Sequence, residues 1–242
     1  MKLTLNFDAP EGTHFGRVKS LDEVVSEIPN LIDAWKVLPS RLVMELDKAR
    51  SWVGYFNGRL LTAPYDTSRP EVDATGLVMM NKANQTPTGL FVLGGAQINT
   101  ALELTIACKV KIAAEKLNED LHYIWGSTTG QINRLEYRIV NGNNYMRFVA
   151  GSASTPVDVD LPANHGGEIA AVVVKNSEGD TLYIDGYPPV NRPQVRDITL
   201  PNLQVGGITP TQADLPGWYQ SFGVWRHAAS PSEVQAIMQW MR

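Results

Sequence analysis

The chain has a single cysteine, no long apolar run and no excess of positive charge, and each absence excludes a class of protein. Cys108 is the only cysteine among 242 residues, which excludes an internal disulfide framework and a zinc site built from cysteines. The formal net charge of −4 gives no electrostatic basis for binding nucleic acid. No apolar run has the length of a membrane span or of a signal-peptide core. Neither nucleic acid nor a membrane is therefore an expected partner.

Sequence motifs of several enzyme classes are also missing. The chain has no phosphate-binding loop, no Gly-x-Ser-x-Gly nucleophile elbow and no dinucleotide-binding glycine motif. The four histidines are scattered and lack the spacing of zinc ligands. The sequence thus predicts no metal site and no cofactor.

What the sequence does contain is a pattern of short strands and turns. Twenty glycines and fifteen prolines favour a turn-rich β architecture over a helical bundle. The clearest strand is predicted over 101–112, where apolar and polar residues alternate and Cys108 lies in the apolar row as a core residue. The turn sequence Asn141-Gly142-Asn143-Asn144 predicts a hairpin between strands over 134–140 and 145–150. Short strands without long helices between them are typical of an antiparallel two-sheet sandwich.

The last quarter of the chain carries four local motifs in a fixed order. A strand over 181–185 ends in an Asp185-Gly186 turn, and a strand over 203–205 ends in two glycines. An aromatic-rich strand over 218–226 follows. The sequence Ser230-Pro-Ser-Glu233 is a capping box with proline at the first helical position, and it predicts a short C-terminal helix.

This order of motifs resembles the C-terminal half of laminin-G-like domains, which belong to the concanavalin A-like lectin and glucanase superfamily. The resemblance covers residues 71–242. It implies a mainly β fold: an antiparallel two-sheet jelly-roll sandwich of the concanavalin A-like type, with a short C-terminal helix.

Some members of this superfamily are glycoside hydrolases that place acidic residues on one strand as Glu-x-Asp-x-x-Glu. Two acidic residues separated by one other residue, as in the first part of this motif, occur here at Glu45/Asp47, Glu71/Asp73 and Asp158/Asp160. None of them has the third acid, so no catalytic residue is assigned and the chain is expected not to be an enzyme. A glycoside hydrolase remains an alternative only if carboxylates distant in sequence converge.

Residues 1–70 differ from the rest and are predicted to form a partly helical N-terminal arm. The sequence Ser20-Leu-Asp-Glu23 is a second capping box. After it, apolar residues recur mostly at steps of four and three: Leu21, Val25, Ile28, Ile32, Trp35 and Leu38. Pro29 and Pro39 interrupt a continuous helix, so two short helices, or a helix and an extended arm, are expected, with 41–53 as a third helical piece.

Turn-forming residues over 57–75 place a domain boundary near residue 70. Two roles remain open for the arm. It either packs on the sandwich as a lid, or joins neighbouring subunits and anchors the chain to a larger assembly.

Four residues are candidates for ligand binding. Sugar recognition stacks ring faces on aromatic side chains and satisfies hydroxyls with polar ones. Trp125 and Tyr145, with Asn143 and Asn144 at the predicted hairpin tip, have these chemistries. For each aromatic residue, core packing or an ordinary surface position is the competing explanation.

Lectin-like relatives often hold calcium with oxygen atoms from loops. Five residues could supply such oxygens here: Asn141, Asn143, Asn144, Asp180 and Asp185. No loop has a calcium-binding motif, so calcium is not assigned as a cofactor.

The resemblance, the missing export signal and the distinct N-terminal segment together favour a structural or attachment component of a large assembly. The expected setting is a phage virion made in the host cytoplasm, in which the chain is a head decoration, fibre or tail-associated protein. Expected partners are other virion proteins, contacted through residues 1–70, further copies of the chain in a homo-oligomer, and surface glycan. The alternative is a soluble carbohydrate-binding module or lectin.

Overall fold

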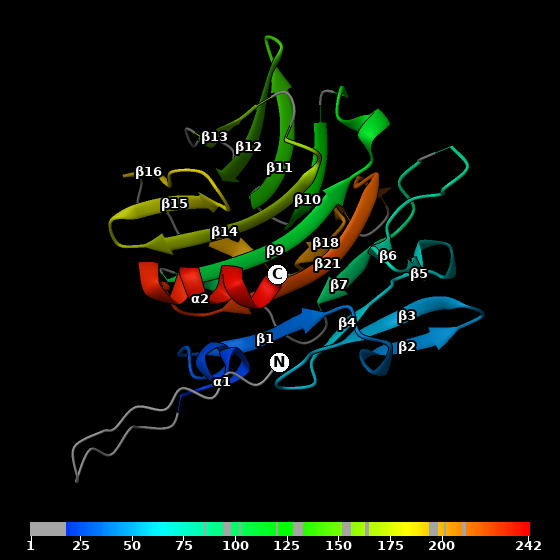
Figure 1. The fold of residues 1–242 in the computed structure, drawn as a ribbon, viewed down its shortest axis with the longest axis horizontal. Coiled ribbons are helices and arrows are strands. Elements are labelled where there is room, and N and C mark those ends of the chain that lie inside the picture. The colour runs from blue at the N-terminus through cyan, green and yellow to red at the C-terminus, as the bar shows by residue number, and fades with distance from the viewer. Residues whose placement is uncertain are drawn as a thin grey trace, which may run out of the picture.

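The computed structural model describes residues 18–84, 86–93, 98–101, 103–119, 121–127, 133–151, 156–162, 165–193, 198–200, 202–209 and 212–242. Within these ranges two antiparallel β-sheets pack face to face, and two α-helices cover the outer side of one sheet (Figure 1). The prediction of a mainly β, two-sheet sandwich with a short C-terminal helix is confirmed. No helix among the described residues is long and apolar enough to cross a membrane.

The first sheet, sheet A, contains eight of the described strands. In spatial order they are β16 (Val190–Arg192), β15 (Gly179–Ile184), β14 (Glu168–Asn176), β9 (Leu104–Ile112), β21 (Gly217–Trp225), β6 (Gly76–Val78) and β5 (Glu71–Asp73), and β1 (Leu31–Lys36) also pairs with β21. On β9, Ile106, Cys108 and Val110 face the second sheet, as the alternating pattern predicts. Ala107 and Lys109 therefore lie on the outer face, which carries the helices.

The second sheet, sheet B, contains nine of the described strands. They are β13 (Val157–Leu161), β12 (Asn143–Ala150), β11 (Asn133–Val140), β10 (Leu121–Ser127), β18 (Gln204–Val205), β7 (Phe91–Leu93), β4 (Leu60–Thr62), β3 (Lys48–Val53) and β2 (Leu42–Glu45). Two small pairs are β17 (Ile198–Leu200) with β8 (Ile98–Ala101), and β19 (Gly207–Thr209) with β20 (Gln212–Ala213). Short 3₁₀ turns lie at η1 (Pro39–Arg41), η2 (Asp66–Ser68) and η3 (Ala114–Lys116).

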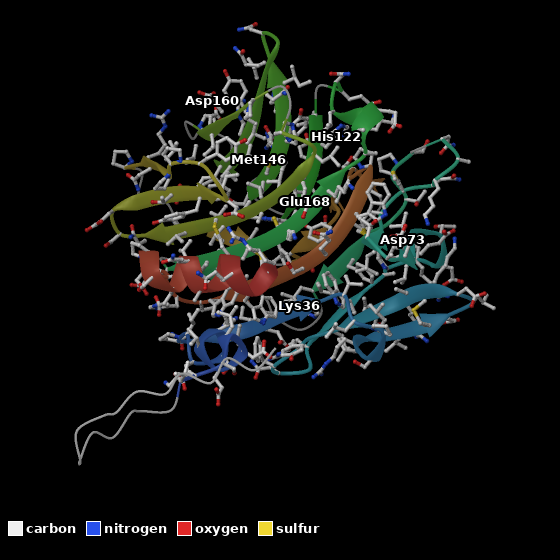
Figure 2. All side chains as sticks on the ribbon, in the orientation of Figure 1. Lys36, Asp73, His122, Met146, Asp160 and Glu168 are labelled. Carbon is white, nitrogen blue, oxygen red and sulfur yellow. The ribbon has the colours of Figure 1, made fainter. Side chains whose placement is uncertain are left out.

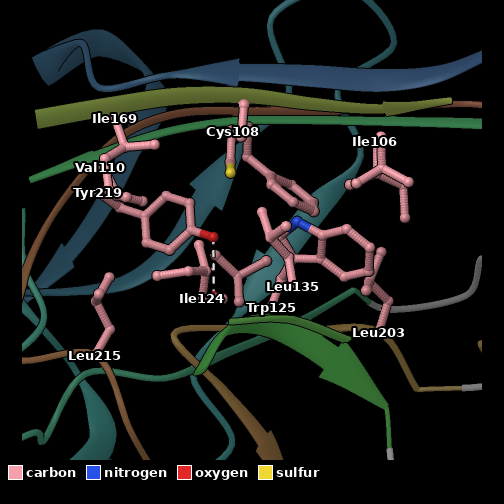
Figure 3. Packing of buried hydrophobic residues seen from close by; sticks show 14 of the residues in the cluster. Ile106, Cys108, Val110, Ile124, Trp125, Leu135, Ile169, Leu203, Leu215 and Tyr219 are labelled. Atoms are coloured by element: carbon pink, nitrogen blue, oxygen red, sulfur yellow. Dashed lines mark hydrogen bonds between the residues drawn. The ribbon is translucent and has the colours of Figure 1, made fainter. Parts of the chain in front are cut away.

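The core between the sheets is rich in aromatic side chains. The Tyr219 hydroxyl donates a hydrogen bond of 2.9 Å to the carbonyl oxygen of Ile124, so its polar end is satisfied inside the core (Figure 3). Cys108 lies in the same core and is fully buried, which confirms its prediction as a core residue. Burial raises the pKa of the Cys108 thiol to about 12.

We expect Cys108 to resist thiol reagents while the protein is folded. Its thiolate is both shielded and disfavoured, so labelling with a disulfide reagent should be at least about 100-fold slower in buffer than in denaturant. The absorbance of the chromophore that the reagent releases measures the labelling rate, and glutathione is the control for reagent activity. Equal rates in the two solvents would contradict this prediction.

The two helices lie side by side on the outer face of sheet A. α2 (Pro231–Met241) begins at the predicted capping box, in which the Ser230 and Glu233 side chains each bind the other residue's backbone N–H. α1 (Leu21–Ser26) begins at the second predicted capping box. Asp22 of α1 joins the two helices, because it accepts a hydrogen bond of 2.8 Å from Trp240 Nε1.

After α1 the N-terminal segment is extended, which agrees with the second of the two predicted alternatives, a helix and an extended arm, and not with two short helices. After α1 the chain turns at Pro29 and at Asn30, which has a positive φ of 54°, and then runs as strand β1. Trp35 of β1 is buried against Phe222, with ring centroids 5.8 Å apart. The apolar residues spaced three and four apart therefore belong to two separate elements, a helix and a strand. Beyond the helix, pairing with β21 outweighs the local preference for helix.

Residues 41–53, expected to include a helical piece, form the β2–β3 hairpin instead. Its turn places Leu46 and Asp47 in the left-handed region, with φ of 50° and 63°. Strands from before residue 70 pair with strands from after it in both sheets, β1 with β21 and β4 with β7. The role of residues 1–70 in assembly or as a lid stays a prediction, and residues 1–17 lie outside the described residues.

Candidate functional site

Trp125 does not serve as the surface stacking residue predicted from the sequence. It lies on β10 with 1% of its surface exposed, and its ring packs on Phe148 with centroids 5.9 Å apart. A register shift in β10 between Tyr123 and Trp125 pairs Trp125 with the core residue Leu135, so its side chain points between the sheets and core packing explains it. This correction removes Trp125 from the candidate ligand-binding residues.

Asn143, Asn144 and Tyr145 do lie at a hairpin tip, between β11 and β12. The turn is formed by Asn141 and Gly142, whose φ angles are 52° and 81°. Asn143 is exposed, whereas Asn144 and Tyr145 are half-buried. Their role in ligand binding stays a prediction.

A hollow lies beside Arg242 at the end of α2, and it is lined by residues of sheet A and by Leu161 of β13 in sheet B. This pocket has a volume of about 560 Å³. Leu161, Ile169, Ile184 and the ring of Tyr187 give it apolar walls. Its polar lining is Lys109, His165, Glu168, Asp185 and Arg242. A pocket with apolar walls and a few converging polar groups is the usual form of a small-molecule site.

Two ion pairs hold the polar groups of the pocket in place. Lys109 of β9 and Glu168 of β14 lie 2.9 Å apart, with the ammonium largely buried and the carboxylate half-exposed. Arg242, which follows α2, binds Asp185 through both carboxylate oxygens at 2.8 and 2.9 Å. The pocket therefore offers hydrogen-bond donors and acceptors from separate elements.

His165 forms one wall of the pocket as a neutral imidazole. Burial lowers the pKa of this histidine below its usual value, so it is uncharged at neutral pH. The Gly167 N–H donates to Nδ1 at 3.2 Å, which assigns the proton to Nε2. Nε2 lies 3.4 Å from the Tyr137 hydroxyl, which itself donates to the carbonyl oxygen of Leu117.

A second hollow of about 300 Å³ adjoins the first, and Lys109 and Arg242 line both. Its other polar side chains include Lys36, Asp73 and Gln220. We call the two hollows together the sheet A groove. Figure 2 shows Glu168 and Lys36 on either side of the C-terminal end of α2 in this view.

Sequence reasoning missed the groove because its residues come from separate segments. The sequence patterns that were recognised are local ones: the Asp185-Gly186 turn and the row of polar residues on β9 that contains Lys109. Only the pairing of β14 with β9 and β15, and the end of α2 above them, brings these groups together.

Two of the residues considered as calcium ligands have other partners. Asp185 binds Arg242, and Asp180 forms a buried ion pair with Lys175. Across the described ranges, no group of three or more His, Cys, Asp and Glu side chains is placed to hold a metal.

Comparisons with known proteins show the fold. No protein-family model and no curated protein sequence matches the chain. Among solved structures, Trypanosoma rangeli sialidase in complex with sialic acid matches over 90% of this chain and 36% of its own, at 11% identity and a TM-score of 0.58. The botulinum neurotoxin serotype D binding domain matches over 91% and 52%, at 12% identity and a TM-score of 0.51. The chain thus spans between a third and about half of these proteins.

A related structure, the botulinum neurotoxin serotype D ligand binding domain in complex with N-acetylneuraminic acid, matches at 12% identity over 91% of this chain and 52% of its own, with a TM-score of 0.50. These likenesses confirm the lectin-like β-sandwich class. The narrower laminin-G-like assignment and the phage setting stay predictions.

The comparisons also correct the expectation that the chain is not an enzyme. A sialidase is an enzyme, and 36% of its chain matches this fold, so the missing Glu-x-Asp-x-x-Glu motif gives no basis for excluding catalysis. Moreover, Glu168 and Asp185, which are distant in sequence, line one pocket. At this level of identity the likeness shows the fold alone and assigns no reaction to the chain.

Proposed function

We propose that the chain is a carbohydrate-binding domain and that the sheet A groove is its glycan site. The observation that carries this proposal is the composition of the larger hollow. It combines the Tyr187 ring with two ion pairs that present donors and acceptors around an apolar floor. Sugars have apolar C–H faces and polar hydroxyl edges, and this lining matches both. The occurrence of sialic acid complexes among proteins of the same fold supports the proposal.

A set of three tyrosine variants tests the site on a glycan array and by titration. We expect Tyr187→Ala to weaken binding of any array-positive glycan at least about tenfold, or roughly 1.4 kcal/mol, because the ring wall is lost. Tyr145→Ala examines the hairpin tip, and Tyr65→Ala, at an exposed tyrosine outside the groove, is the matched control. Thermal unfolding establishes that each variant is folded.

The outcomes separate the two sites. Loss of binding in Tyr145→Ala with full binding in Tyr187→Ala would place the glycan at the hairpin and overturn the groove. An array on which the wild-type chain binds neither neutral nor acidic glycans would overturn the carbohydrate-binding proposal itself.

A glycoside hydrolase is the second candidate, and one observation favours it. Glu168 of β14 and Asp185, in the turn after β15, are carboxylates in the same pocket, and a two-carboxylate hydrolysis requires such a pair. Release of reducing ends from array-positive glycans is the assay. Activity lost in Glu168→Gln and Asp185→Asn would support this candidate, and an absence of release by the wild-type chain would remove it.

The predicted attachment role is compatible with a glycan site, since a glycan-binding domain attaches the assembly that carries it to a surface that bears the glycan. A virion setting, homo-oligomerisation and assembly through residues 1–70 remain proposals. Light scattering on the full chain tests the oligomer: a defined multimer supports it, and a monomer at all concentrations contradicts it.

A further inference from the structure

The charged side chains of the larger hollow form two ion pairs that meet at one end of β14. Lys109 of β9 is the strand partner of Ala170, so it is a diagonal neighbour of Glu168 on the same face of sheet A. This placement lets Lys109 Nζ lie 2.9 Å from Glu168 Oε1. The Asp185 N–H donates a hydrogen bond of 3.0 Å to the carbonyl oxygen of Ala170, which places the second pair, Asp185 with Arg242, beside the first. Ala170 is thus the common neighbour of both pairs.

Each charge in this hollow has its counter-charge in the same hollow. Among the described residues, the lining contains two basic side chains, Lys109 and Arg242, and two carboxylates, Glu168 and Asp185. His165 is uncharged at neutral pH, because burial lowers its pKa. The smaller hollow adds one further lysine and one further aspartate to the described lining, so the whole groove is balanced as well. The larger hollow therefore has no net charge to offer a ligand.

A charged ligand would gain little in such a hollow. A sugar carboxylate loses hydration energy when it is buried, and only a cation that is free to pair with it offsets this loss. Lys109 and Arg242 are already paired, so an acidic sugar would have to displace one of the two carboxylates or lie beside them. A neutral sugar avoids both penalties, because its hydroxyls exchange hydrogen bonds with water for hydrogen bonds with charged groups.

The Lys109–Glu168 pair has the spacing of two adjacent sugar hydroxyls. An ammonium has three N–H donors and a carboxylate has several lone pairs, so one ion pair leaves both groups with further capacity. Adjacent equatorial hydroxyls of a pyranose are staggered by about 60°, which places their oxygens about 3 Å apart. One hydroxyl can therefore accept from Lys109 while its neighbour donates to Glu168, since the two charged atoms lie 2.9 Å apart. The Glu168 carboxylate is half-exposed, so a ligand can reach it.

From this arrangement we infer that the larger hollow binds a neutral sugar unit, with two adjacent hydroxyls held by Lys109 and Glu168. The inference rests on the proposed function and specifies its ligand class. The apolar C–H face of the same sugar lies toward Tyr187 and the aliphatic walls, and the Arg242–Asp185 pair contacts a further hydroxyl.

Calorimetric titration of the full chain with matched neutral and acidic sugars tests the inference. The pairs are lactose with 3′-sialyllactose, and the methyl ester of trigalacturonic acid with the free acid. We expect at least one neutral sugar to bind, and to bind about threefold or more tightly than its acidic partner, because the acid meets no unpaired cation.

Two variants that change the charge of the hollow in opposite directions locate the hydroxyls. Glu168→Gln leaves Lys109 without its counter-charge, so the ratio of acidic to neutral affinity should rise about tenfold. Lys109→Met removes the cation, so it should lower that ratio and weaken binding of the neutral sugar about threefold or more. Side chains that only shape the hollow would not shift the ratio in opposite directions.

Two further variants are the matched controls. Glu178→Gln and Lys48→Met change exposed residues that line neither hollow, and they should keep the ratio of the wild-type chain. Thermal unfolding establishes that each variant is folded.

The contrary results are distinct. Tighter binding of the acidic member of either pair, lost in Tyr187→Ala, would overturn the neutral ligand class and leave the glycan site standing. A ratio that moves in neither Glu168→Gln nor Lys109→Met would overturn the placement of the hydroxyls at the ion pair. Absence of binding by all four sugars, together with a blank glycan array, would overturn the proposed function and the inference together.

Discussion

Replacing Asp33 with alanine is expected to destabilise the folded chain by about 4 kcal/mol, among the largest effects of any single substitution. Asp33 lies on β1 and is fully buried. Its carboxylate accepts hydrogen bonds from four backbone N–H groups, those of Ala34, Phe56, Asn57 and Arg59, at 2.8–3.1 Å. Without the carboxylate these buried donors lose their partner, and the loop over 54–59 loses the group that shapes it.

Denaturant unfolding measures this effect, with Asp160→Ala, at an exposed aspartate on β13, as the matched control. Asp33→Asn should destabilise the fold nearly as much as Asp33→Ala, because the side-chain amide would direct its own N–H groups at the backbone N–H donors of the loop. Gly54→Ala offers an independent check: a Cβ there would lie 1.8 Å from Asp33 Oδ2. Unfolding midpoints for both Asp33 variants close to that of Asp160→Ala would contradict the prediction.

Asp33 also shows where sequence reasoning stops. Alternation and turn chemistry are local, so they predicted the 134–150 hairpin, the Cys108 row and both capping boxes. The loop that Asp33 organises begins 21 residues later, at Gly54, and nothing in the local pattern links the two positions. A second short helix beyond Ser26, one of the two predicted alternatives, does not form for a related reason, since pairing with β21 decides the conformation of β1.

The groove was beyond sequence reasoning for the same physical cause. Lys36, Lys109 and Arg242 line the groove and are far apart in sequence, and only the pairing of β1 and β9 with β21 and the end of α2 bring them together. Aromatic residues were the sequence signal for sugar binding, but burial rather than residue type decides which ring a ligand can reach. Trp125 is in the core, whereas Tyr187, not singled out, lines a pocket.

The second large effect concerns a charged pair inside the sandwich. Lys175 of β14 is fully buried and lies directly across from Asp180 of β15, with Nζ 3.5 Å from Oδ1. We expect Asp180→Asn to destabilise the fold by about 3–5 kcal/mol, because it leaves a buried ammonium without its counter-charge. Denaturant unfolding gives the value, and Asp160→Asn on the exposed surface is the matched control.

A double-mutant cycle shows whether charge is the cause. Lys175→Met keeps most of the side-chain volume and removes the ammonium, so Asp180→Asn should be much less harmful in that background. The coupling energy between the two positions should then be about 2 kcal/mol or more, as found for residues in direct contact. If the two substitutions simply add, the ion pair does not stabilise this end of the sandwich, and the backbone pairing of β14 with β15 and the apolar residues around Lys175 hold it.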